Sequence, residues 1–199
     1  MATKVYITKW SFWSPGEGSS DAPPLPFVSP MIRRRLSQLT RMTLHAVHEV
    51  SQGKPNIKIT FSSEYGEITQ QLKISEEILE SNTVSPAKFS NSVFNTPVAI
   101  STIVEKSTVG YSAICSGKDS FYSGFCECLA AISSGDGKER IFVHGDELIP
   151  KPYQILANGQ NTPFVIALLF SLTPSNNSIE VPKDFHCTGL DFAKTFLHI

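Results

Sequence analysis

The sequence has no excess of charge of either sign. Its 199 residues include 17 Lys and Arg against 18 Asp and Glu, which gives a formal net charge of −1. A strongly basic chain would have suggested nucleic acid or an anionic membrane surface as its partner. The balance here gives no such indication, and we expect no nucleic-acid partner.

Cysteines are few, and their spacing does not suit a metal site. The four are Cys115, Cys126, Cys128 and Cys187, and no two of them form a C-x-x-C pair. Because structural zinc sites commonly use such pairs, we predict no metal, and we expect no cofactor. Thiols without an evident disulfide framework suit a reducing compartment, so we expect a cytoplasmic protein.

Long hydrophobic runs are also absent. The longest is FVIALLF at residues 164–170, whereas a transmembrane helix needs about 20 apolar residues. The opening segment KVYITKW has the pattern of a strand and not that of a secretory leader. We therefore expect no membrane span.

What the sequence does contain is an alternation of strand and helix patterns. Alternating or β-branched apolar segments predict strands, helical spacing predicts helices, and Pro97 predicts that the stretch at 87–106 forms two short helices. The expected strands are 4–9, 56–63, 110–115, 140–145 and 164–172, and the expected helices are a long one from residue 30, 67–80 and 119–134. This order predicts an α/β fold with βαβ crossovers, a parallel or mixed sheet and helices on both faces.

The long helix is expected to begin at Ser29-Pro30, with Ser29 as its N-cap and Pro30 in its first turn. Its apolar residues at helical spacing predict one buried face; they are Leu36, Leu39, Thr43, Val47 and Val50. Arg33, Arg34 and Arg35 fall at its start. Such a basic cluster is either a solvated surface or a docking patch for an acidic partner.

Cys115 stands where a strand is predicted to pass into a helix. A helix N-terminus and a nearby cation such as Lys118 can activate a thiol as a nucleophile. Most free cysteines are instead unreactive small residues at the end of an element. His144, which is followed by Gly-Asp-Glu, and His186, in a Gly-containing turn, are possible acid–base partners.

The order of five segments resembles the N-terminal half of the β-ketoacyl synthases, and especially the short synthase-like subfamily that includes chain-length-factor subunits of aryl-polyene and related polyketide pathways. The segments are PMIRRRLSQLTRMTLHAV, ITFSSEYGEI, VSPAKFSNSVFNTPVAI, AICSGKDSFYSGFCECLAAI and RIFVHGDELIP. The resemblance covers about residues 5–155. It implies one α/β half of the thiolase fold as a single domain over 1–199, with 156–199 as a shortened C-terminal extension.

The same resemblance bears on catalysis. It implies that Lys118 or its immediate neighbourhood occupies the position of the synthases' nucleophilic cysteine, while a shift of the alignment by about three residues would place Cys115 there. The resemblance implies that the family's two basic catalytic side chains come from the second half of the fold, and we expect this chain not to contain that half. The resemblance therefore implies a subunit that is not catalytic alone. The alternative is a truncated ketosynthase or acyltransferase with Cys115 as nucleophile and His144 or His186 as its partner.

A non-catalytic subunit of this kind is expected to pair with a full ketosynthase, as a heterodimer or a larger assembly, and to work on acyl chains carried by acyl carrier protein. The resemblance implies that one segment lies near the subunit interface and shapes the acyl tunnel in polyketide, aryl-polyene or fatty-acid-like elongation; its residues are Phe89, Asn91, Val93, Phe94, Asn95 and Val98. Arg33 to Arg35 would suit an acidic carrier protein. A homodimeric scaffold that binds an acyl chain without chemistry is the remaining alternative.

Overall fold

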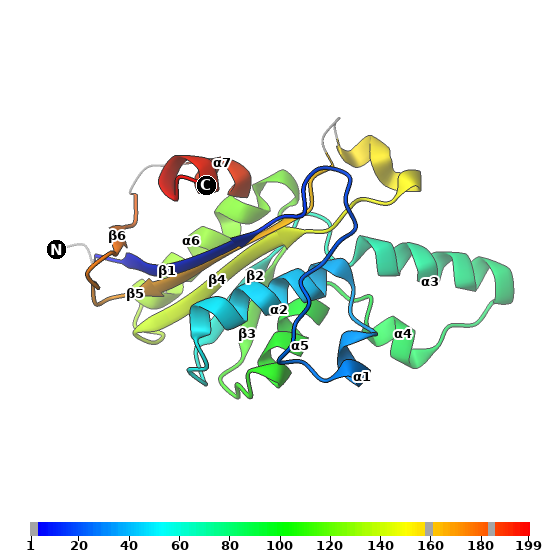
Figure 1. Cartoon of the computed structure of the whole chain (residues 1–199), viewed down its shortest axis with the longest axis horizontal. Helices are drawn as coiled ribbons and strands as arrows, with labels where there is room; N and C mark the ends of the chain where they lie inside the picture. The colour runs from blue at the N-terminus through cyan, green and yellow to red at the C-terminus, as the bar shows by residue number, and fades with distance from the viewer. Residues whose placement is uncertain (1–3, 158–160, 183–185) are drawn as a thin grey trace.

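The computed structural model describes residues 4–157, 161–182 and 186–199 and shows a six-stranded mixed sheet (Figure 1). The strand order across the sheet is β3-β2-β4-β5-β1-β6. The strands are β1 Tyr6–Trp13, β2 Lys58–Ser62, β3 Tyr111–Ile114, β4 Glu139–Asp146, β5 Phe164–Ser171 and β6 Ile179–Glu180. Strand β2 pairs in parallel with β3 and β4, whereas β5 is antiparallel to both β4 and β1. The predicted mixed sheet is confirmed.

Helices cover both faces of this sheet, as the sequence predicts (Figure 1). On one face lie α2 (Gln38–Ser51) and α5 (Thr96–Val104), and on the other lie α6 (Ser120–Ser133) and α7 (Gly189–Phe196). Each face has its own apolar cluster: α2 packs on Ile59, Phe61 and Val143, and α6 with α7 packs on Phe142 and Phe170. The fold is that of a three-layered α/β domain.

The apolar run at 164–170 is the strand β5, and all eight residues of this strand are buried. Its side chains alternate between the two apolar clusters. Val165, Ala167 and Leu169 face the α2 side. Ile166, Leu168 and Phe170 face the α6 side. A strand covered on both faces therefore reads as a continuous hydrophobic run, without the polar alternation of a half-exposed strand.

The prediction of a single long helix from residue 30 is wrong. The chain forms a short α1 (Pro30–Arg33) and then a separate α2, with Leu36 half-buried between them. The cause is Ser37, whose Oγ accepts a hydrogen bond from the Thr40 backbone N–H at 2.9 Å and so caps a new helix. Ser29 stands before α1 but makes no side-chain capping bond.

The remaining elements lie around the ends of the sheet. They are α3 (Ile68–Ser81), α4 (Pro86–Ser90), the 3₁₀ turn η1 (Gly117–Asp119) and the 3₁₀ segment η2 (Lys151–Ala157). Helix α3 extends away from the body as an arm (Figure 1), and only Ile68 and Ile74 of its residues are buried. Pro97 lies in the first turn of α5, which confirms that 87–106 forms two short helices. The sequence did not predict β6 or α7.

Candidate functional site

A cavity of about 350 Å³ opens at the carboxyl ends of the parallel strands β2 and β4. Its wall combines the end of β4, the η1 turn that precedes α6, the η2 segment and the first turn of α7. Apolar side chains from Phe121, Ile149 and Phe164 line it beside polar ones from Lys118 and His144. Ligand sites of α/β folds commonly lie at this edge of the sheet, so the cavity is the candidate site.

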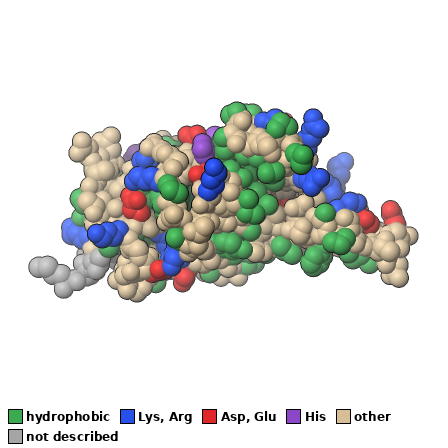
Figure 2. Space-filling model, turned by 90° about the horizontal axis from the view of Figure 1, so that it is seen from below, with side chains coloured by type: hydrophobic (Ala, Val, Ile, Leu, Met, Phe, Trp, Pro, Cys, Tyr) green, Lys and Arg blue, Asp and Glu red, His purple; other side chains and the backbone are tan. Residues whose placement is uncertain are grey.

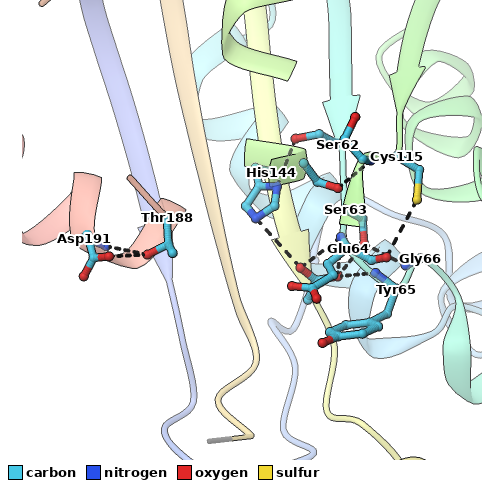
Figure 3. Close-up of polar contacts among 12 residues, drawn as sticks. Ser62, Ser63, Glu64, Tyr65, Gly66, Cys115, His144, Thr188 and Asp191 are labelled. Carbon is cyan, nitrogen blue, oxygen red and sulfur yellow. Dashed lines mark hydrogen bonds and ion pairs between the residues drawn. The ribbon is translucent and has the colours of Figure 1, made fainter. Parts of the chain in front are cut away.

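His144, near the end of β4, is the buried basic side chain of this cavity. Its Nδ1 lies 2.9 Å from Ser62 Oγ, and its Nε2 lies 3.8 Å from Asp146 Oδ2 (Figure 3). The Phe121 ring meets the imidazole edge-on, with ring centroids 5.4 Å apart. Burial lowers the pKa of His144 to about 3, so this imidazole is neutral at neutral pH.

Asp146 fastens the loop after β2 to the end of β4. Its carboxylate accepts hydrogen bonds from Ser63 Oγ at 2.5 Å, from the Glu64 backbone N–H at 3.0 Å and from the Tyr65 backbone N–H at 2.9 Å (Figure 3). Burial raises the pKa of Asp146 to about 6, although these donors act in the opposite direction. The carboxylate is therefore committed to holding backbone and hydroxyl groups of its own chain.

Ser62, His144 and Asp146 lie in the order of a serine-hydrolase triad, but they cannot work as one. Ser62 is fully buried and is covered by α6 at Gly124, where an added Cβ would lie 2.8 Å from Ser62 Oγ. A nucleophilic hydroxyl must reach a substrate carbonyl, and this one is sealed between a strand and a helix. The arrangement is consequently a structural network that joins β2 to β4.

The structure separates Cys115 from Lys118, the two residues considered for the nucleophile position. Lys118 lies in the η1 turn and lines the cavity. Cys115 is exposed and does not line it, and its Sγ lies 3.7 Å from the carbonyl oxygen of Glu64 (Figure 3). The η1 turn also stands between Cys115 and the first residue of α6, so the thiol is not directly at the N-terminus of that helix.

His186 lies outside the cavity. Its side chain is 67% exposed, and its Nε2 lies 3.4 Å from Asp119 Oδ1, with its ring against Tyr122. Of the two histidines that the sequence offers to Cys115, only His144 lines the cavity, and Cys115 does not. Among the described residues, no cluster of three or more His, Cys, Asp and Glu could hold a metal ion.

The segment predicted to shape an acyl tunnel lies at α4 and the start of α5, away from this cavity. Phe89 is 55% exposed, and the Asn95 side-chain amide donates to Tyr111 Oη at 2.7 Å. Phe94 packs on Phe61 with ring centroids 5.5 Å apart, and Val98 is fully buried in the core. The tunnel role of this segment stays a prediction.

Asn91 and Val93, the other two residues of that segment, are half-buried in the connection between α4 and α5. The six predicted residues therefore do not form one continuous patch. Two of them pack inward, one is at the surface, and three are partly exposed.

The three arginines at 33–35 are also not equivalent. Arg33 donates from one guanidinium nitrogen to the carbonyl oxygens of Pro24 and Leu25 and so holds the proline-rich loop against α1. Arg34 and Arg35 are exposed. The predicted docking of a carrier protein would therefore depend on Arg34 and Arg35, and it stays a prediction.

Comparison with known proteins identifies the family. A family model described as the N-terminal domain of β-ketoacyl synthases matches residues 10–188. The chain belongs to this family. No curated protein matches it.

Solved structures support the same placement in the ketosynthase family. A ketosynthase (ApeO) in complex with its chain length factor (ApeC) from Xenorhabdus doucetiae matches with a TM-score of 0.74 and 26% identity, over 86% of this chain and 80% of that one. The ishigamide ketosynthase/chain length factor matches with a TM-score of 0.68 and 12% identity, over 84% of this chain and 62% of that one.

A β-ketoacyl synthase from Burkholderia phymatum STM815 matches with a TM-score of 0.66 and 10% identity, over 85% of this chain and 59% of that one. At these lower identities the likeness is one of fold. The chain thus spans about three fifths of two of these ketosynthase structures and four fifths of the first. The fold predicted from the resemblance, a thiolase-like ketosynthase N-terminal half, is confirmed.

Sequence reasoning missed the network that organises the cavity. It considered His144 but not Ser62, Ser63 or the role of Asp146. The available signal was positional, because the Ser-Ser pair lies at the end of one buried strand and the Gly-Asp pair lies at the end of another. Polar residues at the carboxyl ends of neighbouring parallel strands meet at one edge of the sheet. The order of the strands was needed to see this, and the sequence did not provide it.

Proposed function

We propose that this chain is a non-catalytic, chain-length-factor-like subunit that pairs with a full ketosynthase. In the pair it would shape the acyl tunnel during polyketide, aryl-polyene or fatty-acid-like elongation on acyl carrier protein. The observation that carries the proposal is that the cavity at the strand ends is faced by Lys118, while the Cys115 thiol lies outside it. The similarity to ketosynthase and chain-length-factor complexes supports the same role.

An unfinished surface supports a partner subunit. Strand β3 is an edge of the sheet, and within the described part of the chain β2 is its one strand partner. Helices α1, α4 and α5 and strand β3 carry exposed apolar side chains that we call the apolar face; they are Met31, Ile32, Phe89, Ile103 and Tyr111, which are 38% to 73% exposed. Figure 2, viewed from the side of α1, α4 and α5, shows apolar side chains gathered over this side of the molecule. Exposed apolar surface of this kind commonly marks a protein interface.

The predicted tunnel segment adjoins that face. Asn95 holds Tyr111 of the edge strand, and Phe89 is itself part of the apolar face. A partner that covers β3 and α4 would therefore bury Phe89 and bring its ring against the wall of the partner's acyl tunnel. A phenylalanine at that place would limit chain length by excluded volume, since packed interiors do not absorb extra methylene groups at low cost.

Further parts of the proposal concern domain organisation, location and the carrier. We infer that residues 1–199 form one ketosynthase-like domain, with 156–199 as its shortened C-terminal extension.

The free thiols at all four cysteines suit the reducing cytoplasm. No helix among the described residues has the length and apolar character needed to cross a membrane. Arg34 and Arg35 would offer positive charge to an acidic acyl carrier protein.

The rival function is a truncated ketosynthase or acyltransferase that uses Cys115. Its supporting observation is the exposure of that thiol at the end of β3. A thiol-directed acyl probe separates the two functions. Rapid labelling of Cys115, with loss of acyl transfer in Cys115→Ala, would establish the rival and overturn the non-catalytic role.

The test of pairing is co-expression with a ketosynthase encoded beside this chain, followed by size-exclusion chromatography with mass determination. We expect a stable complex for the unmodified chain and its loss in Phe89→Asp, because a buried unpaired charge in an interface is costly. The matched control is Ile155→Asp, which changes an 88% exposed apolar side chain on η2 outside the apolar face. A well-behaved monomer that does not bind the ketosynthase would contradict the proposal.

A further inference from the structure

One arginine lies in the layer between the sheet and α6. Arg140 is the second residue of β4, and its side chain is only 4% exposed. It shares a face of the strand with Phe142, which packs beneath α6 in the apolar cluster of that side. A buried guanidinium group is stable only where its charge is paired and its N–H groups are hydrogen-bonded. Arg140 does not line the cavity at the strand ends, so the candidate site does not account for it.

Three nitrogens of this guanidinium group donate to three different elements. Nε donates to Thr60 Oγ1 on β2 at 2.9 Å, and Nη2 donates to Ser112 Oγ on β3 at 2.8 Å. Nη1 donates at 2.8 Å to Asp136 Oδ2, in the turn between α6 and β4. The Arg140 side chain therefore extends from its own strand across β2 to the edge strand of the sheet.

The charge of Arg140 is balanced by the carboxylate of Asp136. The other oxygen of Asp136 accepts a hydrogen bond from Lys58 Nζ at 2.5 Å. The hydrogen bonds from Lys58 and Arg140 lower the pKa of Asp136, so its carboxylate is charged at neutral pH. Because this carboxylate supplies the countercharge, the contact with Ser112 is not needed to neutralise Arg140. What that contact adds is a link between β4 and β3.

Strand β3 has little packing of its own beyond its backbone pairing with β2. None of its four residues is buried. Within the described part of the chain, two of its side chains form hydrogen bonds: Tyr111 with Asn95 of the α4–α5 segment, and Ser112 with Arg140. Because successive side chains of a strand point to opposite faces, these two bonds hold β3 from both sides of the sheet. The position of the edge strand therefore depends on polar contacts more than on an apolar core.

We propose that Arg140 is a positioning residue, which fixes the edge strand β3 from β4 and so sets the place of Tyr111 on the apolar face. The planar guanidinium group presents its donors in a rigid arrangement, and partners on three elements determine where it lies. The consequence for pairing with a ketosynthase rests on the proposed function. The positioning of β3 within the chain does not.

Amide hydrogen exchange of the full chain tests the positioning of β3. Ser112→Ala removes the acceptor and keeps the arginine, and we expect the amides of residues 111–114 to exchange roughly tenfold faster. The amides of β5 should keep their rates, because that strand lies inside the sheet. Ser112→Thr retains a hydroxyl acceptor and should restore slow exchange in β3. Ser134→Ala, at an exposed serine directly after α6, is the matched control.

Two results would overturn the positioning role. Unchanged exchange of residues 111–114 in Ser112→Ala would mean that this hydrogen bond does not hold β3. Equal acceleration in β3 and β5 would mean that the serine supports the stability of the whole chain and not the place of one strand.

Arg140→Lys tests the consequence for pairing. A lysine keeps the positive charge near Asp136, but its single nitrogen cannot replace three nitrogens that reach three partners. We expect the β3 amides to lose most of their protection from exchange. The dissociation constant of the ketosynthase complex should rise about tenfold, because only molecules with the strand in place bind the partner. In Ser112→Ala the strand stays in place most of the time, so this constant should change less than about twofold.

The double variant Ser112→Ala/Asn95→Ala takes the place of Arg140→Lys if the latter does not fold, because it removes the side-chain hydrogen bonds on both faces of β3. An unchanged dissociation constant in a variant whose β3 has lost its protection would overturn the role of Arg140 in pairing. If the unmodified chain binds no ketosynthase, the proposed function fails, and exchange in residues 111–114 still decides whether Arg140 positions β3.

Discussion

The cavity at the carboxyl ends of β2 and β4 and the apolar face on the side of β3 differ in whether their side chains are satisfied within the chain. At the cavity, the polar side chains are satisfied by their own chain: His144 by Ser62, and Asp146 by three donors. On the apolar face, large apolar side chains are exposed. A catalytic subunit needs the reverse, with reactive groups free in the cavity. This difference is what we expect if, as proposed, the chain is a non-catalytic subunit whose apolar face meets a partner.

The largest effect on stability is expected from removing the carboxylate of Asp146. Asp146→Ala leaves the Ser63 hydroxyl and the backbone N–H groups of Glu64 and Tyr65 without their acceptor in a buried loop. We expect the free energy of unfolding to fall by about 3 kcal/mol. The matched control is Asp119→Ala, at an aspartate whose side chain is 62% exposed, with a change within about 0.5 kcal/mol. Chemical denaturation measures both, and equal effects would mean that Asp146 is not structural.

Between pH 7 and pH 5, a smaller effect on stability is expected from the acid titration of His144. Burial lowers the pKa of His144 from 6.5 to about 3, so below pH 6.5 the unfolded chain binds a proton that the folded chain refuses. Stability due to this residue therefore falls as the pH falls from 6.5 towards 3, by roughly tenfold in the unfolding equilibrium constant per pH unit. Asp146 acts in the opposite sense between about pH 6 and 3.8, because its pKa is raised in the folded chain.

His144→Asn removes the first of these effects and leaves the second. The variant should consequently lose less stability than the unmodified chain when denaturation is measured at pH 7, 6 and 5. His186→Asn, at a 67% exposed histidine, is the control and should follow the unmodified chain. Parallel curves for all three proteins would show that His144 is not held neutral by burial.

The sequence predicted the layers of the fold better than the connections between them. β5 and α6 were predicted because their apolar patterns are long and the core enforces them. The break between α1 and α2 was missed because one serine cap at Ser37 outweighs a continuous apolar spacing. The candidate site was predicted only in part, since Lys118 and His144 come together through a strand order that local patterns do not encode.

The smallest effect on stability is expected within the predicted tunnel segment, where an exposed and a packed phenylalanine can be compared. Phe89 is 55% exposed, so Phe89→Ala should change the free energy of unfolding of the isolated chain by less than about 0.5 kcal/mol. Phe94 packs on Phe61 and lies over Gly66, so Phe94→Ala should cost about 2 kcal/mol.

In the complex with a ketosynthase, Phe89→Ala should change the length of the products more than Phe94→Ala does. If Phe89 is buried by the partner and closes the end of its tunnel, Phe89→Ala leaves a space that a longer acyl chain fills, and mass spectrometry of the products should show the shift. The Phe94 side chain packs inside its own chain. Phe94→Ala should therefore lower the yield of the complex more than it changes the length of the products. Products of unchanged length from Phe89→Ala, with the complex intact, would remove Phe89 from the tunnel and leave the apolar face as a surface for pairing alone.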